Sequence, residues 1–196
     1  MHRSPFLLLG LVWMGAAAAA QGVPAAAATG TRAELREWRY VPGDRPEYAD
    51  PGYDDSGWAS VRLPARLNLD AGRGWLRGEF DGSGMPDGEV YLLLGRVDAA
   101  AEVYLNGSLI GRRGTLVPEF TVPGNQPGVF LLPSRLWNPR GGNLLALRLA
   151  APASALDASG FQIGDGSAAD YERRVIGFFN FELYTVLGAL CAFFGL

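Results

Sequence analysis

The chain has 196 residues, a formal net charge of −3 at pH 7, and many dispersed glycines and prolines. This length suits one domain of ordinary size with short additions, and the mildly acidic balance argues against a nucleic-acid partner, which calls for a clustered basic face. Short apolar runs separated by glycine and proline favour an all-β sandwich over packed helices. The single cysteine, Cys191, excludes an intrachain disulfide.

The chain opens with the pattern of a secretory signal peptide, which we assign to residues 1–20. Arg3 supplies a positive charge, residues 6–14 form an apolar stretch, and residues 16–20 are all alanine. Cleavage after Ala28, where small residues repeat, is one alternative, and an uncleaved signal anchor is another. We therefore expect the remainder of the chain to be exported.

Removal of this segment has a chemical consequence, because it contains His2, the only histidine of the chain. Histidine is the commonest general base and metal ligand. A Ser-His-Asp triad, a Cys-His pair and a histidine zinc site are therefore excluded from the mature protein. Residues 21–33 are rich in alanine, glycine, threonine and proline without periodicity, and we expect them to form a disordered leader.

Residues 34–165 are predicted to form a jelly-roll β-sandwich with eight or nine strands. Its clearest part is the apolar run 90–94, which suits a strand buried on both faces, followed by alternation over 101–105. Asn106 and Gly107 then give the strongest short-range hairpin signal, because both tolerate the positive φ of a type I′ turn. A further strand over 117–122 contains a proline, which suits a sheet edge.

Four motifs in this domain resemble those of a known family. Residues 54–64 (DDSGWASVRLP), 74–80 (GWLRGEF), 101–111 (AEVYLNGSLIG) and 142–149 (GNLLALRL) occur in the same order. Together they resemble the galactose-binding-like, sugar-binding jelly-roll domain at the N-terminus of glycoside hydrolase family 2 enzymes. The resemblance covers roughly residues 34–150. It implies a non-catalytic domain, because the catalytic carboxylates of that family belong to a separate downstream barrel.

Five side chains are candidates for a saccharide site, since such sites combine an aromatic platform with a few fixed polar groups. Trp75, Arg77 and Glu79 alternate onto one face of their strand, and Glu102 and Tyr104 share a face of another. If both strands present these faces to one concave surface, a polar and aromatic groove results. The alternative is that the tryptophan fills a core and the arginine pairs with a neighbouring carboxylate.

Acidic turns suggest other sites that we consider weaker. Asp54 and Asp55 are adjacent, so turn chemistry explains them better than a catalytic acid pair. The oxygen-rich turns at 81–84 and 165–167 are candidates for a structural calcium ion, but their spacing does not match an EF-hand loop. We therefore expect no cofactor and no metal ligand, with calcium as the alternative.

Residues 175–196 are almost wholly apolar and are predicted to form a transmembrane helix, preceded by a linker at 166–174. Twenty-two residues suffice to span a bilayer core, which needs about 20. A carboxylate at mid-helix costs about 2.5–3.5 kcal/mol, so we expect Glu182 near the interface or facing another helix. Because the apolar run reaches the last residue, we expect further membrane helices or a fragment. The alternative is an amphipathic or buried helix.

The order of these segments resembles the N-terminal part of bacterial seven-transmembrane receptors with diverse intracellular signalling modules. The resemblance implies an extracytoplasmic ligand-sensing domain, on the periplasmic or extracellular side of a membrane, that binds carbohydrate or another small ligand. The C-terminal helix would hold it in the membrane, and no nucleic acid would be involved. One alternative is an ancillary sugar-binding domain of a membrane-attached glycoside hydrolase. Another is a structural or protein-interaction module that uses the edge strand 117–122.

Overall fold

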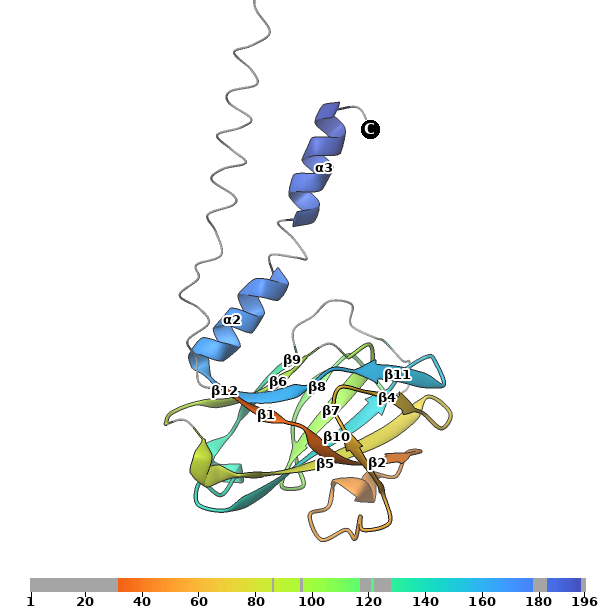
Figure 1. Cartoon of the computed structure of the whole chain (residues 1–196), viewed down its shortest axis with the longest axis vertical. Helices are drawn as coiled ribbons and strands as arrows, with labels where there is room; N and C mark the ends of the chain where they lie inside the picture. The colour runs from red at the N-terminus through yellow and green to blue at the C-terminus, as the bar shows by residue number, and fades with distance from the viewer. Residues whose placement is uncertain are drawn as a thin grey trace, which may run out of the picture.

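The computed structural model describes residues 32–85, 87–95, 97–116, 121, 128–177 and 183–194. The predicted signal peptide and almost all of the predicted leader lie outside these residues, as does most of the predicted edge strand at 117–122. The described strands form a layered β body from which two helices lead away (Figure 1).

Two antiparallel sheets make up this body. Among the described residues, the larger sheet has the strand order β3-β2-β5-β10-β7-β8, which corresponds to Ala59–Arg62, Glu37–Pro42, Arg73–Asp81, Gly142–Ala150, Ala100–Leu105 and Ser108–Arg113. The smaller sheet has the order β1-β12-β6-β9, which corresponds to Arg32–Leu35, Phe161–Asp165, Val90–Leu94 and Gly128–Leu132. A separate pair joins β11 (Ala155–Ala158) to β4 (Ala65–Asn68). Single 3₁₀ turns lie at η2 (Pro46–Ala49), η3 (Gly82–Gly84) and η4 (Ser134–Leu136).

The core lies between the two sheets and follows the alternation of the sequence. Leu76 and Leu147, from the larger sheet, are fully buried, and so are Phe161 and Ile163 from the smaller one. The Trp38 ring bridges the sheets by packing edge-on against Phe161, with ring centroids 5.2 Å apart. The strands therefore form a β-sandwich, as the sequence predicted.

The predicted hairpin joins β7 to β8. Asn106 and Gly107 have φ values of 47° and 83°, as a type I′ turn requires. The Asn106 side chain also donates to the Leu136 carbonyl (2.8 Å) and accepts from the Leu144 amide (2.8 Å). This residue therefore fixes the turn and also connects it to β10 and η4.

A helix occupies the segment predicted to be a linker at 166–174. Helix α2 (Gly166–Gly177) follows β12 directly, and the Asp165 carboxylate caps it by accepting from the Ala168 amide (2.9 Å). Ala168 is fully buried and packs against Leu93 on the outer face of the smaller sheet. The cap and the small residues of the first turn explain why the chain docks here as a helix.

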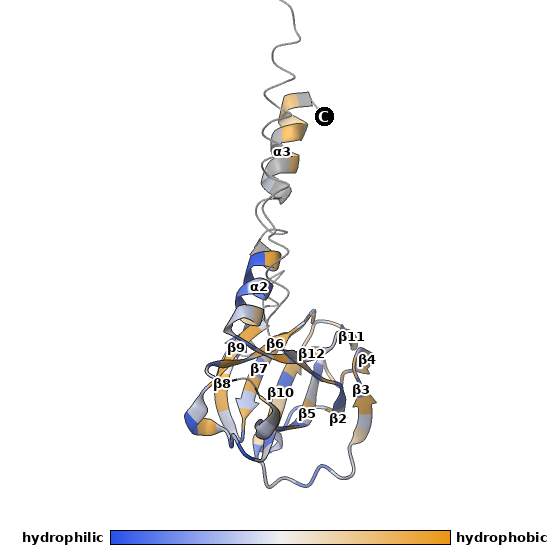
Figure 2. Ribbon diagram, turned by 60° about the vertical axis from the view of Figure 1, so that its left-hand side comes forward, coloured by the Kyte–Doolittle hydropathy of each residue, from blue (hydrophilic) through white to orange (hydrophobic). Residues whose placement is uncertain are grey.

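The second helix, α3 (Leu183–Phe194), consists mainly of apolar residues, in contrast to the more polar α2 (Figure 2). Leu187, Leu190 and Phe193 are exposed on it. No helix within the described ranges combines the length and the apolar character needed to cross a bilayer. At about 1.5 Å per residue, twelve residues extend about 18 Å, against a hydrocarbon core of about 30 Å. The transmembrane helix at 175–196, part of which lies outside the described residues, stays a prediction.

Candidate functional site

The candidate residues do share one face of the larger sheet. Arg148 of β10 is the register partner of Trp75 on one side and of Glu102 on the other. The rings of Trp75 and Tyr104 lie 5.6 Å apart across Ala146, so aromatic and charged groups meet on the outer face as the sequence indicated. The structure thus brings together side chains from strands that are far apart in the chain.

This face is covered by the β2–β3 connection, residues 43–58. Tyr48 from this connection packs edge-on against both Trp58 (ring centroids 4.9 Å) and Trp75 (5.9 Å). Trp75 has no exposed surface, and Tyr48 is also buried. The aromatic residues therefore form a second, smaller core on the outer face, in which Trp75 and Tyr48 are buried and Tyr53, Trp58 and Tyr104 are half-buried, so Trp75 is not an open platform for a sugar ring.

Arg77 holds that connection in place. Its side chain is only 4% exposed, and its Nε donates to the Asp55 carboxylate at 2.7 Å. Its Nη1 donates to the carbonyls of Tyr48 (2.8 Å) and Asp50 (2.7 Å), and the guanidinium lies 5.8 Å from the Trp58 ring centroid. One cation thus satisfies several groups of a segment without regular strands, which is a structural role.

Glu102 is the buried member of a charge network that reaches the surface at Asp44 and Arg112. It accepts hydrogen bonds from the Tyr104 hydroxyl (2.8 Å), Arg112 Nε (2.9 Å) and Arg148 Nη1 (3.1 Å), and Arg148 also makes two 2.7 Å bonds to Asp44. Burial opposes ionisation of Glu102, but these donors hold its pKa below the ordinary value. Burial, with the bond to Glu102, raises the pKa of Tyr104 to about 12.

Glu79 differs from the other four candidates because its side chain is exposed. Trp75 and Arg77 are buried beneath the connection, while Glu102 is largely buried and Tyr104 half-buried. The sequence therefore identified a real cluster, and its contacts with the connection and within the charge network account for its geometry. A role of these residues in ligand binding stays a prediction.

The acidic turns are also explained by local contacts. Asp54 accepts from the Ser56 amide (3.0 Å), whereas Asp55 pairs with Arg77, so the two carboxylates do not act as a pair. In the first turn proposed for calcium, Asp81 accepts from the Ser83 amide (2.9 Å). Within the part of the chain that the structure describes, no group of three or more histidine, cysteine or acidic side chains could hold a metal ion.

A cavity of about 550 Å³ opens at a different place, where the edges of the two sheets meet. Residues 34–36, 62–64 and 159–162 line it, and we call it the seam cavity. The chain leaves the smaller sheet at Leu35 and enters the larger sheet at Glu37, and the Leu63 amide donates to the Arg36 carbonyl (2.9 Å) across this crossing. Sequence reasoning missed the cavity because its walls come from three distant segments.

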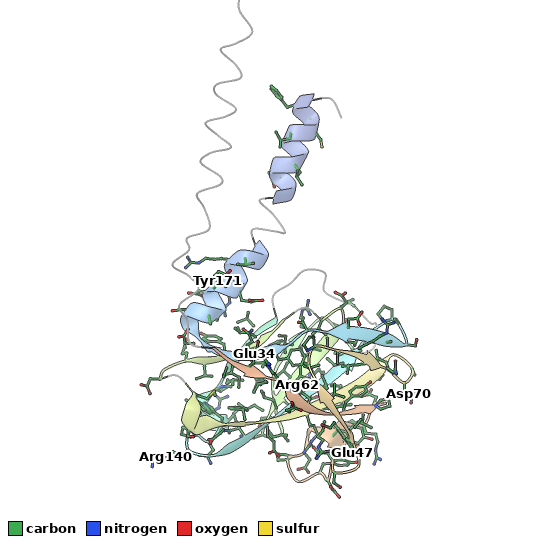
Figure 3. All side chains as sticks on the ribbon, viewed as in Figure 1. Glu34, Glu47, Arg62, Asp70, Arg140 and Tyr171 are labelled. Carbon is green, nitrogen blue, oxygen red and sulfur yellow. The ribbon has the colours of Figure 1, made fainter. Side chains whose placement is uncertain are left out.

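The lining of the seam cavity combines charge with apolar surface. Glu34 of β1 and Arg62 of β3, both labelled in Figure 3, line the cavity, and Arg36 pairs with Glu34. Leu35 and the buried Leu63 provide apolar wall. The volume lies within the range of about 300–1,000 Å³ that is typical of small-molecule sites, which also mix apolar surface with a few polar groups.

Among the comparisons with known proteins, the one with solved structures supports the fold. No family model and no curated protein matches the chain. It is similar to solved structures of a calcium-binding mutant of Bacteroides uniformis β-glucuronidase 2 (22% identity, TM-score 0.51), a β-glycosidase from Bacteroides vulgatus (17%, 0.53) and a glycosyl hydrolase family 2 member from Bacteroides cellulosilyticus (16%, 0.54).

These likenesses establish the fold. Each match covers 68% of this chain but only 18–20% of the other, so the chain spans about a fifth of the length of those enzymes. The sandwich therefore resembles one β domain within glycoside hydrolase family 2 enzymes, which agrees with the four sequence motifs. The layout of a membrane receptor is not among the properties these matches support.

Proposed function

We propose that this chain is a non-catalytic β-sandwich module that binds a saccharide in the seam cavity, as an accessory domain of a larger carbohydrate-active protein. The observation that carries the proposal is the cavity itself, which joins hydrogen-bonding side chains to apolar wall on a fold shared with one domain of glycoside hydrolases. The covered outer face of the larger sheet is the less suitable surface, because Trp75 is fully buried beneath the connection and Tyr104 is half-buried.

The carboxylates of the cavity support a non-catalytic role. Glycosidases of the usual kinds place two carboxylates about 5–9.5 Å apart around the scissile bond. The described lining of the seam cavity contains one, Glu34, and that carboxylate is already paired with Arg36. Such a site can hold a sugar through hydrogen bonds but lacks the second group that cleavage needs.

A steric block tests the proposal. At Gly160, which lines the cavity, an added Cβ would meet no atom within 4 Å, so Gly160→Leu adds bulk without a clash at Cβ. Gly57, on the connection that covers the outer face, is equally free of neighbours, and Gly57→Leu is the matched control. The full chain and both variants are titrated calorimetrically with a panel of mono- and disaccharides.

We expect a Kd of about 0.1–1 mM, which corresponds to roughly −5.5 to −4 kcal/mol, for the unmodified chain and the control. Gly160→Leu should weaken binding at least tenfold. Absence of binding to every sugar at 10 mM, or unchanged binding by Gly160→Leu, would contradict the proposal.

A second candidate is the extracytoplasmic domain of a membrane receptor, and the C-terminal helices favour it. Strand β12 lines the seam cavity with its first residues and continues without a break into α2, which packs on the smaller sheet (Figure 1). Beyond α2 lies the apolar α3. A ligand that binds one arrangement of β12 and α2 better than another would shift their equilibrium.

Two observations separate the candidates. A reading frame that continues into a soluble barrel with paired carboxylates supports the accessory domain, whereas further apolar helices and a signalling module support the receptor. Membrane attachment is tested by expressing the full chain in bacteria and extracting the membranes with alkaline carbonate. Retention in the membrane fraction supports an anchor at the C-terminal helix, and complete release argues against it.

A further inference from the structure

The described lining of the seam cavity carries an unbalanced positive charge. It contains one carboxylate, Glu34, and two guanidinium groups, Arg36 and Arg62. Arg36 directs both Nε and Nη2 to one oxygen of the Glu34 carboxylate, so these two residues neutralise each other. The remaining cation of the lining is Arg62.

Arg62 is held only weakly by the protein. Its nearest acidic partner is Glu37, with the Arg62 Nε and Glu37 Oε1 atoms 3.6 Å apart. Both side chains are about two-thirds exposed, at 66% and 68%, and Glu37 does not line the cavity. Solvent-exposed pairs of this kind contribute little to stability, so a carboxylate in the cavity could take the place of Glu37 at small cost.

Two other lining residues, Glu34 and Gln162, suit hydroxyl groups. Glu34 of β1 and Gln162 of β12 are register partners, so their side chains are direct cross-strand neighbours on the smaller sheet. A carboxylate and an amide together accept and donate, as vicinal hydroxyls require. Leu35 and Leu63 add apolar wall for the C–H groups of a sugar ring.

We infer that the seam cavity selects a sugar that carries a carboxylate, a uronate, with Arg62 binding the carboxylate and the Glu34–Gln162 pair binding ring hydroxyls. The inference rests on the proposed function and deepens it by naming the ligand class. A planar guanidinium matches a carboxylate through two parallel hydrogen bonds, which a neutral hexose cannot offer.

The test compares sugars that differ in one group. The full chain is titrated calorimetrically with glucuronate and galacturonate, with glucose and galactose, and with acetate as a carboxylate without a sugar. Arg62→Gln removes the proposed anchor. Arg66→Gln is the matched control, because Arg66 is 67% exposed, pairs with Asp157 at 3.5 Å and does not line the cavity.

We expect both uronates to bind at least tenfold more tightly than the neutral hexoses and acetate at low ionic strength. Arg62→Gln should remove this preference, and Arg66→Gln should preserve it. Raising the salt concentration from 50 to 300 mM should reduce the preference, since the anchor is exposed to solvent.

Five outcomes would overturn the inference. Neutral hexoses that bind as tightly as uronates would refute the ligand class and leave the proposed function standing, whereas absence of binding by any sugar would refute both. Acetate that binds as tightly as the uronates would show a simple anion site. Uronate binding that is unchanged in Arg62→Gln, or equally reduced in Arg66→Gln, would show that Arg62 is not the anchor.

Discussion

Replacing Arg77 by methionine should loosen the connection over the outer face of the larger sheet. The substitution keeps a long side chain but removes the cation that pairs with Asp55 and binds the carbonyls of Tyr48 and Asp50. Breaking a buried ion pair by removing one partner costs about 3–5 kcal/mol. Asp55 is 26% exposed and regains some hydration, so we expect about 3 kcal/mol here, toward the lower end of that range.

Two assays detect this loss. For a chain of this size, about 1 kcal/mol lowers Tm by roughly 2–4 °C, so Arg77→Met should lower it by about 6–12 °C. Near-ultraviolet circular dichroism should also lose intensity before global unfolding, because Trp58 and Trp75 depend on the connection for their packing. Urea titration gives the free energy of unfolding from the same samples.

Arg39 supplies the matched control. It lies directly opposite Arg77 in the register of β2 and β5, on the same sheet, but its side chain is exposed. Arg39→Met should therefore change stability by less than about 0.5 kcal/mol. If the two variants lose similar stability, or if Arg77→Met stays within about 0.5 kcal/mol of the unmodified chain, the assigned role of Arg77 is wrong.

Three further substitutions test other parts of the fold. In Gly78→Ala the new Cβ would lie 2.7 Å from the Trp38 ring, so overpacking should cost about 1–3 kcal/mol in urea unfolding. Asp165→Ala removes the cap of α2 and should cost about 1 kcal/mol, seen as faster amide exchange in the first turn of that helix. The pKa values of Asp44 and Glu102 lie below their ordinary values, because of hydrogen bonds from Arg148 to Asp44 and from three donors to buried Glu102. Their contribution to stability is therefore present above ordinary values of 3.8 and 4.5 and is lost as pH falls through the lower folded values. Glu102→Gln should therefore reduce the fall in the urea unfolding midpoint between pH 5 and pH 2. An unchanged pH dependence of the midpoint would contradict this assignment.

Local patterns predicted the elements of the sandwich well. The turn at Asn106 and Gly107 depends on backbone preferences of two adjacent residues, and it forms as expected. Alternation placed Trp75 and Arg77 on one face of their strand, because side-chain direction in a strand has a fixed period of two. The structure turns that face outward and Leu76 toward the core. These properties depend only on residues that are neighbours in the chain, so they can be predicted from the sequence.

The sequence did not predict that residues 43–58 cover the outer face of the larger sheet. Whether Trp75 is open or buried depends on where residues 43–58 pack, and their position is set by contacts such as Arg77 with Asp55, 22 residues away in sequence. Burial of a polar face beneath an irregular segment leaves no periodic signal. The helix over the predicted linker at 166–174 is a related case, since it depends on Ala168 packing against Leu93 of a distant strand.

The position of the seam cavity connects the ligand site to the end of the chain. Phe161 and Gln162 line the cavity at the start of β12, and three residues later Asp165 caps α2. A short strand that is hydrogen-bonded to both β1 and β6 cannot shift at one end alone, so movement at the cavity would reach the helix. Both proposed functions can use this arrangement. In an accessory domain it would be a rigid support for a neighbouring domain, and in a receptor it would link the ligand site to the membrane. Amide exchange of the first turn of α2, measured with and without glucuronate, distinguishes the two proposed functions. Only a domain that signals to a membrane helix requires the exchange rate to change when the ligand binds.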